Sequence, residues 1–260
     1  MRSLILLIAL GAFALPASAQ TWKISTAYSL GLPQSTMKSN IQADHSLQGS
    51  LLYAVPGTKH RVLLGAELGL GLYASKRIDQ TFQFDNNTTS IVPVNYTSNS
   101  FNASLGSRFN LLGDRNLIIP YLSLKGGLYN LFSTVVIEDP KNPDGCHALD
   151  RKNIINDATG YFAAGGGLQI DAALFTRVKH RGNVHIDLSI QSVRGGEISY
   201  INTRHLVDAQ TMNNPEGKPL EVQFVSASTQ AIHEHTVAQV FTTPLRLLEF
   251  RVGVVAALGW

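Results

Sequence analysis

The amino-acid sequence predicts an all-β fold: a transmembrane antiparallel up-and-down β-barrel of about eight strands, with short periplasmic turns and long extracellular loops. Three observations support this prediction. The chain opens with an export signal, and apolar residues then alternate with small or polar residues over stretches long enough to cross a membrane. The connections between these stretches alternate between long and short.

The first residues of the chain have the features of a secretory signal peptide. Arg2 precedes an apolar run from Leu4 to Leu15, and Ala17-Ser18-Ala19 supplies the small residues of a cleavage site. We therefore expect a signal peptide over residues 1–19, cleavage before Gln20 and a barrel domain over residues 20–260. An uncleaved N-terminal membrane anchor is the alternative. After Gln20 no stretch of roughly 18 successive apolar residues predicts a transmembrane helix.

The alternation is clearest over Val62–Leu72. The even positions are aliphatic, whereas the odd positions are mostly small and include one charged residue, Glu67. Soluble strands average about five or six residues, but a transmembrane strand needs about 9–11 and alternates between lipid-facing and lumen-facing positions. We therefore assign Leu68 and Leu70 to the lipid face and Glu67 to the lumen.

The same alternation recurs in seven further segments, which are residues 22–30, 47–55, 101–109, 118–128, 161–171, 184–191 and 248–260. Short turns are expected at Pro56–His60, Leu111–Asn116 and Phe175–Asn183. Long connections are expected at Gly31–Asp44, Lys76–Asn95, Ser133–Asp157 and Asn202–Val237. This order places every long connection at one end of a meander and both chain ends at the other, periplasmic end. Strands that begin at Trp22 and end at Trp260 leave no room for a periplasmic domain.

The lumen-facing positions carry equal numbers of positive and negative side chains. They are Lys23, Arg108, Lys125 and Arg251, with Glu67, Asp171, Asp187 and Glu249. In a barrel of about eight strands the interior is just wide enough for side chains to fill it, and buried charges are costly unless they pair. We therefore predict a lumen charge network that plugs the barrel. Its middle layer contains Glu67, Lys125, Glu249 and Arg251, and a layer nearer the periplasm contains Arg108, Asp171 and Asp187. A narrow polar path for ions or small solutes is the alternative.

Other residues have the chemistry of a site but not the arrangement. His185, Asp187 and Ser189 are residue types of a hydrolase, yet they lie side by side on one strand and a nucleophile needs a converging base. His233-Glu234-His235 offers two histidine ligands, too few for a closed metal site. Cys146 is the single cysteine, and we interpret it as a loop thiol. No catalytic residue, metal or cofactor is predicted.

The C-terminus carries the most specific pattern in the chain. Apolar residues alternate up to a terminal aromatic residue, at Phe250, Val252, Val254, Ala256, Leu258 and Trp260. With the strand pattern, this end resembles the small bacterial outer-membrane barrels of the OmpA/OmpX/OmpW type, over nearly all of the mature chain. The resemblance implies that these six residues form the signal read by the outer-membrane assembly machinery. A terminal Phe is commoner in that family than Trp.

The sequence therefore favours a non-enzymatic protein of the bacterial outer membrane, with a binding, adhesion or structural role in the envelope or a place in an envelope or secretion assembly. The expected partners are outer-membrane lipids and lipopolysaccharide, the assembly machinery and an extracellular or envelope protein. The net charge of +3 is too weak to indicate nucleic-acid binding. A narrow channel and a lipid-modifying enzyme are the alternative functions.

Overall fold

The computed structural model describes residues 22–83, 89–113, 116–138, 148–175, 183–204, 206, 217–225 and 232–258. The predicted signal peptide, Cys146 and Trp260 lie outside these residues. The elements are β1 (Trp22–Pro33), α2 (Met37–Asn40), β2 (Asp44–Ala54), β3 (Val62–Gln83), β4 (Thr89–Asn110), β5 (Ile118–Glu138), β6 (Ala148–Asp171), the 3-10 helix η1 (Ala172–Leu174), β7 (Val184–Ile201), β8 (Lys218–Val225) and β9 (Ile232–Leu258). No helix among the described residues is long and apolar enough to cross a membrane.

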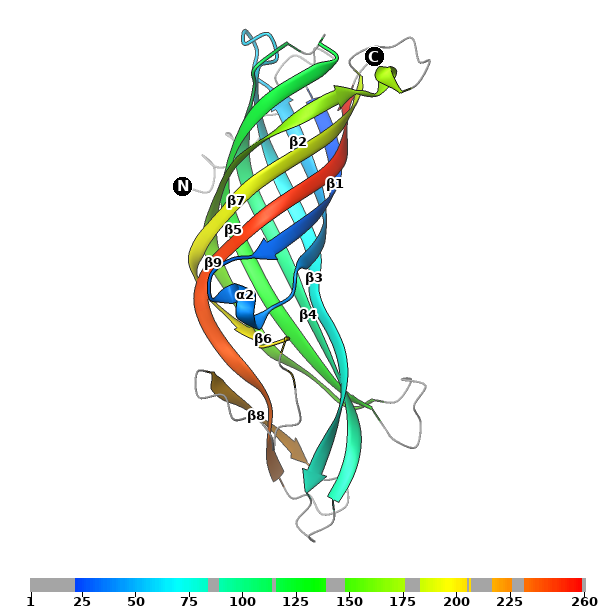
Figure 1. Ribbon diagram of the computed structural model, residues 1–260, viewed down its shortest axis with the longest axis vertical. Coiled ribbons are helices and arrows are strands. Elements are labelled where there is room, and N and C mark those ends of the chain that lie inside the picture. The colour runs from blue at the N-terminus through cyan, green and yellow to red at the C-terminus, as the bar shows by residue number, and fades with distance from the viewer. Residues whose placement is uncertain are drawn as a thin grey trace, which may run out of the picture.

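Eight strands close into one antiparallel barrel, which confirms the predicted fold class (Figure 1). Neighbours in the sequence pair from β1 to β7, and β9 closes the ring by pairing with both β7 and β1. The closure with β1 runs from Trp22 opposite Leu258 to Pro33 opposite Leu247. β8 lies outside the ring and, among the described residues, pairs with the first part of β9.

The part of the barrel that is built from the eight predicted segments, which is the upper half in Figure 1, has an apolar outer wall and a polar interior. On β3, Leu68 is 60% exposed on the outside, whereas Leu63 is fully buried inside. We call the outward residues of this part the apolar belt: they include Ile24, Tyr28, Leu47, Leu51, Leu64, Leu70, Leu105, Leu122, Leu128, Phe162, Leu168, Ile190, Phe250, Val252 and Val254. The inside and outside assigned from the sequence agree with the structure.

The strands continue well past the belt, and there the two faces exchange polarity. Within the belt, β4 presents apolar Phe101 and Leu105 outward and polar Ser104 inward. Closer to its start, the same strand buries Val94 and Tyr96 and turns Asn95 outward. The period of two is unbroken. We call this part of the barrel the extension; on β4 it includes Val94, Asn95 and Tyr96. Two apolar clusters fill its interior.

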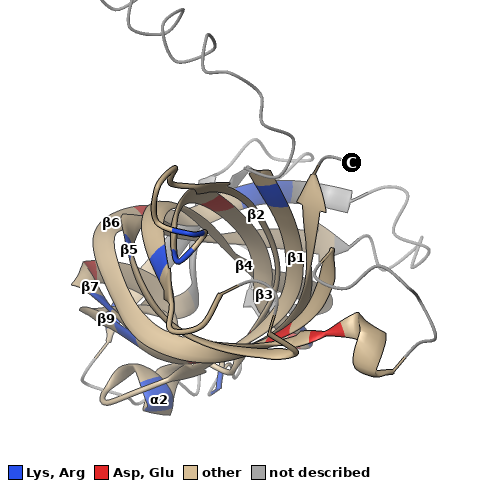
Figure 2. Ribbon diagram, turned by 90° about the horizontal axis from the view of Figure 1, so that it is seen from above, with Lys and Arg blue, Asp and Glu red and all other residues tan. Residues whose placement is uncertain are grey.

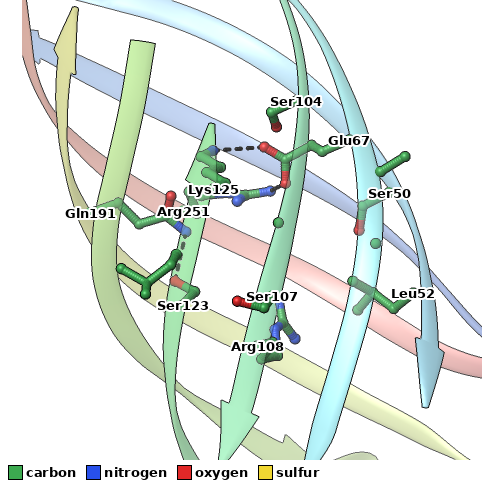
Figure 3. Close-up of a pocket in the computed structure, with 14 residues that line it drawn as sticks. Ser50, Leu52, Glu67, Ser104, Ser107, Arg108, Ser123, Lys125, Gln191 and Arg251 are labelled. Carbon is green, nitrogen blue, oxygen red and sulfur yellow. Dashed lines mark hydrogen bonds and ion pairs between the residues drawn. The ribbon is translucent and has the colours of Figure 1, made fainter. Parts of the chain in front are cut away.

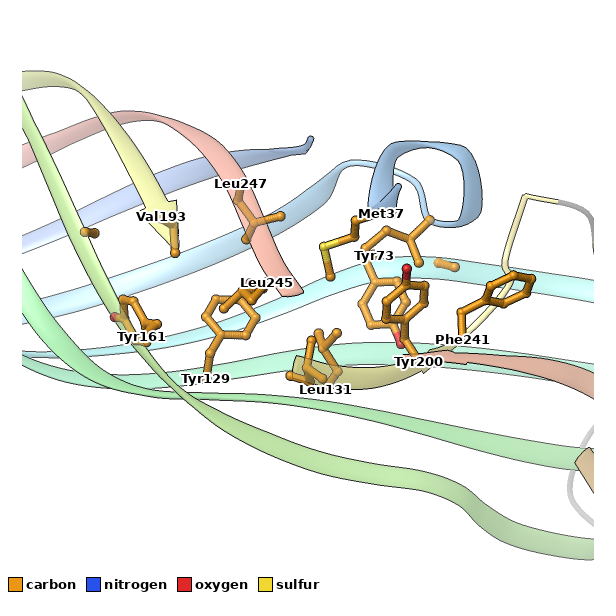
Figure 4. Packing of buried hydrophobic residues seen from close by; sticks show 14 residues of the cluster. Met37, Tyr73, Tyr129, Leu131, Tyr161, Val193, Tyr200, Phe241, Leu245 and Leu247 are labelled. Carbon is orange, nitrogen blue, oxygen red and sulfur yellow. The ribbon is translucent and has the colours of Figure 1, made fainter. Parts of the chain in front are cut away.

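The first cluster is rich in aromatic side chains and lies just past the polar lumen (Figure 4). Tyr73, Tyr129 and Tyr200 are buried in it together with Met37 and Leu245. The second cluster lies at the far end, where Val92, Val94, Tyr96, Val135, Ile137 and Ile201 are buried together. Much of the connections predicted as long loops at residues 76–95 and 133–157 is therefore strand. The physical reason is that their inward positions carry enough apolar surface to build a core in water.

A short segment closes one side of the extension. β1 ends at Pro33 and β2 begins at Asp44, whereas β3 and β9 both run on. The segment between β1 and β2 contains α2, which lies over this side (Figure 1). It buries Met37 and Ile41 completely or almost so. The backbone N–H of Thr203 donates to Asn40 O at 2.9 Å and the Arg204 side chain donates to Ile41 O at 2.8 Å, which ties the segment to the end of β7.

The opposite end of the barrel has two of the three predicted short turns among the described residues. Between β2 and β3, Gly57, Lys59 and His60 all have positive φ, which is the conformation that a tight turn requires and that glycine adopts without strain. The connection between β4 and β5 spans only residues 111–117. Residues 176–182 of the third turn lie outside the described part of the chain.

Candidate functional site

The centre of the lumen holds four charged side chains from three strands. Figure 3 shows three of them, Glu67, Lys125 and Arg251. Lys125 on β5 contacts Glu67 on β3 at 2.7 Å and Glu249 on β9 at 3.3 Å. Arg251, two residues after Glu249, contacts the second oxygen of Glu67 at 2.7 Å. The four formal charges cancel, and each side chain is at most 12% exposed. The structure thus brings together all four residues that the sequence assigned to the middle layer.

Neutral side chains add hydrogen bonds to this central cluster. The Ser29 hydroxyl donates to Glu249 at 2.7 Å, and the Gln48 amide donates to the same carboxylate oxygen. Ser25 and Ser50 share a hydrogen bond of 2.6 Å close by, between β1 and β2. All four residues lie at inward positions of the predicted strands. These polar partners were not predicted, because only the charged residues at inward positions were assigned to the network.

A second cluster lies nearer the short turns. Arg108 on β4 and Asp187 on β7 form an ion pair of 2.8 Å. The Tyr121 hydroxyl donates to the same Asp187 carboxylate, and the Arg108 guanidinium lies over the Tyr121 ring, 4.1 Å from its centre. A cation placed over an aromatic face gains further electrostatic stabilisation. Tyr121 could have been found from its inward position on the predicted strand.

The other two predicted members of the network lie on β6 and β1. Asp171 was assigned to the same layer as Arg108 and Asp187, and its carboxylate accepts a hydrogen bond of 2.9 Å from Ala173 N and so caps η1. A carboxylate at the end of a strand can bind the free N–H groups of the following helical turn. Lys23, at an inward position of β1, is buried, with 3% of its surface exposed.

Two small cavities adjoin these clusters in the described part of the chain. One of about 40 Å³ lies between Glu67, Arg108, Lys125 and Gln191, which is room for a few water molecules. A smaller one of about 10 Å³ lies beside Asp187 and Ser189.

A third polar cluster lies at the junction between the lumen and the extension. Asp44, at the start of β2, is 5% exposed. Its carboxylate accepts hydrogen bonds from Ser100 at 2.9 Å and from Tyr129 at 2.8 Å. The Tyr129 ring packs edge-on against Tyr161 at 5.8 Å between centres. The sequence analysis placed Asp44 at the end of a long connection. Extending the inward positions Gln48 and Ser50 backwards by the period of two would have found it.

The remaining candidates do not come together as a site in the described residues. Asp187 binds Arg108 and Tyr121, while His185 lies opposite Asp171 in the β6–β7 pairing. The His233-Glu234-His235 segment belongs to β9, but its side chains are outside the described part, as is Cys146. Among the described residues no three His, Cys, Asp or Glu side chains gather as metal ligands would. Phe250, Val252, Val254 and Leu258 point outward from β9.

Comparison with known proteins finds no family model and no curated protein that matches. Solved structures do match, and their architecture is that of small outer-membrane barrels. Neisserial surface protein A is 12% identical with a TM-score of 0.47, covering 91% of this chain and 97% of that one. A major outer membrane protein from Thermus thermophilus is 13% identical with a TM-score of 0.38, covering 90% and 98%. Ail of Yersinia pestis, solved with a heparin analogue, is 9% identical with a TM-score of 0.37, covering 91% and 96%. At these identities the likeness is one of architecture alone.

Proposed function

We propose that this protein is an integral outer-membrane barrel with a sealed lumen. Its role is non-enzymatic: it anchors a rigid β-extension outside the membrane, where the extension meets an envelope or extracellular partner. The observation that carries the proposal is the exchange of polarity along the strands. An apolar outer wall over a polar interior suits lipid, and a polar outer wall over an apolar interior suits water.

The boundary between the two regimes can be followed on three adjacent strands. On β3 the outward residues change from Leu72 to Ser75, Arg77 and Asp79 at the β-bulge after Leu72. On β4 they change from Phe101 to Asn99, which lies opposite Leu72, and on β5 from Leu128 to Asn130, which lies opposite Phe101. The change is thus offset by two residues from each strand to the next. A change from apolar to polar outward residues is expected where a barrel leaves the hydrocarbon layer.

The lumen supports a sealed barrel more than a channel. A conducting path needs water and uncompensated charge, whereas Glu67, Lys125, Glu249 and Arg251 neutralise one another. Beyond them the apolar clusters around Tyr73 and Val94 fill the interior. Arg108 and Asp187 are likewise engaged with each other in an ion pair.

Site-specific labelling in whole cells tests the location and the orientation. Cysteine replaces Arg77 in the extension or Lys59 in the turn at the other end, each in a Cys146→Ser background. We expect a membrane-impermeant maleimide to label Arg77→Cys in intact cells, and Lys59→Cys only after the outer membrane is permeabilised. The reverse pattern would invert the orientation. Recovery of the unlabelled protein in the soluble periplasmic fraction would refute the proposal.

A further inference from the structure

Two arginines lie side by side on the outer surface of the barrel. Arg194 on β7 and Arg246 on β9 are direct cross-strand partners, and both side chains are exposed. Among the described residues neither guanidinium forms an ion pair, and Arg246 donates a 3.4 Å hydrogen bond to the Ser35 hydroxyl. Like charges directly opposite each other destabilise an antiparallel pair, so the pair has a cost that a bound anion would remove.

The pair lies at the edge of the apolar belt. Toward the apolar belt, the next outward residues are Leu248 and Phe250 on β9 and Ser192 and Ile190 on β7. On its other side Arg194 is opposite Phe162 of β6, which is 59% exposed. Two cations thus lie next to the apolar belt, on the side of the extension, at the level where lipid headgroups would lie.

The neighbouring charges leave this spot positive. Lys38 is exposed on α2, the segment that contacts Arg246 through Ser35, and Figure 2 shows α2 beside β9 on the outside of the wall. The acidic residue next along β7 is Glu197, which follows the bulge at Gly195 and Gly196 and lies opposite Pro244 rather than either arginine.

We propose that Arg194 and Arg246 bind a phosphate group of a phosphorylated, multiply acylated glycolipid in the outer leaflet, with its acyl chains on the belt around Leu248, Phe250 and Ile190. A guanidinium matches phosphate with two parallel hydrogen bonds. A phosphomonoester carries about −1.5 to −2 charges near neutral pH, which suits two arginines better than a phosphodiester does. The inference rests on the proposed function, because it needs the belt to lie in a membrane.

Binding to purified lipids tests the site. The folded protein in a zwitterionic detergent is titrated with bis-phosphorylated lipid A, with the same lipid after removal of both phosphates, with phosphatidylglycerol and with inorganic phosphate. We compare wild type with Arg194→Gln/Arg246→Gln. The control, Lys59→Gln/Arg61→Gln, removes the same charge from exposed positions at the other end of the barrel.

The expected result is a loss of tenfold or more in affinity for bis-phosphorylated lipid A in the Arg194→Gln/Arg246→Gln protein, and less than twofold in the control. Lipid A without phosphates should bind all three proteins alike and weakly. Equal loss in both double variants, or inorganic phosphate binding as tightly as the lipid, would overturn the inference.

A stability measurement gives an independent readout. Without lipid, Arg246→Gln should unfold at the same or a higher temperature than wild type, because it removes the repulsion from Arg194. With bis-phosphorylated lipid A the order should reverse. A variant that is less stable without lipid and gains as much from lipid as wild type would contradict the proposal. Alkaline extraction of proteoliposomes separates the two levels: failure to insert refutes the proposed function, whereas insertion without lipid preference refutes only this inference.

Discussion

Lys125 Nζ lies 2.7 Å from Glu67 Oε1, across the lumen between residues 58 positions apart in the sequence. Neither strand is the neighbour of the other, since β4 lies between β3 and β5. The contact is therefore made through the barrel interior and not along the sheet. It ties separate parts of the wall together at the depth where Arg251 and Glu249 join from β9.

Breaking this cluster should be costly. Replacing Lys125 by Ala leaves Glu67 and Glu249 facing each other with only Arg251 between them, and removal of one partner from a buried pair costs about 3–5 kcal/mol. Urea unfolding in lipid vesicles measures the loss. A second test compares the double variant Glu67→Gln/Lys125→Met with its two single variants, Glu67→Gln and Lys125→Met. The double variant should lose less free energy of unfolding than the sum of the two single losses. Strict additivity would show that the two residues do not interact.

The apolar belt predicts a depth-dependent response to charge. Leu68→Arg should reduce the free energy of unfolding in vesicles by about 2–4 kcal/mol, the cost of an arginine on the lipid face near the bilayer midplane. Ser75→Arg is the matched control, on the same strand and the same outer face but past the bulge. It should be within about 0.5 kcal/mol of wild type. Equal losses of unfolding free energy at both positions would show that the edge of the apolar belt does not lie between Leu68 and Ser75.

The extension should be as ordered as the belt. Hydrogen exchange followed by mass spectrometry should show protected amides over residues 75–83 and 89–97, where β3 and β4 pair. Unstructured loops would exchange within seconds. Val94→Ala, at a fully buried position, should cost about 1–3 kcal/mol and raise exchange in the extension while the belt stays protected. Thr97→Ala, at a more accessible outward position of the same strand, is the control that should leave exchange unchanged.

The order of the segment that contains α2 should depend on the burial of Met37. Met37 is fully buried, whereas its neighbour Lys38 is exposed. Met37→Ala removes the anchor of the segment and should cost about 2–5 kcal/mol. Local amide exchange over residues 34–43 should rise. Lys38→Ala should not change it, and an equal effect of both changes would mean that the segment does not depend on burial in the core.

The sequence predicted the barrel because lipid imposes one rule on every strand that crosses it. The prediction is wrong for the residues past the apolar belt, where the outward positions are no longer apolar. Val92, Val94 and Tyr96 alternate just as Phe101, Ala103 and Leu105 do, but on the other face of β4. A search for apolar outward positions stops at the point where polarity reverses, so it assigns the extension to loops.

The candidate site was predictable only in its charges. Glu67, Lys125, Glu249 and Arg251 could be assigned to one depth from their positions on the strands. The pairing of Arg194 with Arg246 depends on the register between β7 and β9 near a bulge, and no local pattern encodes it. The need for glycine at position 165 depends on register too, since a Cβ there would clash with Ile190 O of the neighbouring strand.

Conductance across a planar bilayer tests the central claim of a sealed barrel most directly. Purified wild-type protein should give no steady current, because the charge clusters and the apolar core of the extension fill the lumen. Lys125→Ala combined with Tyr129→Ala should open brief conductances, since it removes both the central cation and an aromatic residue above it. Silence of the wild type with openings in the variant is the predicted result. A steady open conductance from the wild-type protein would contradict the account and make the protein a channel.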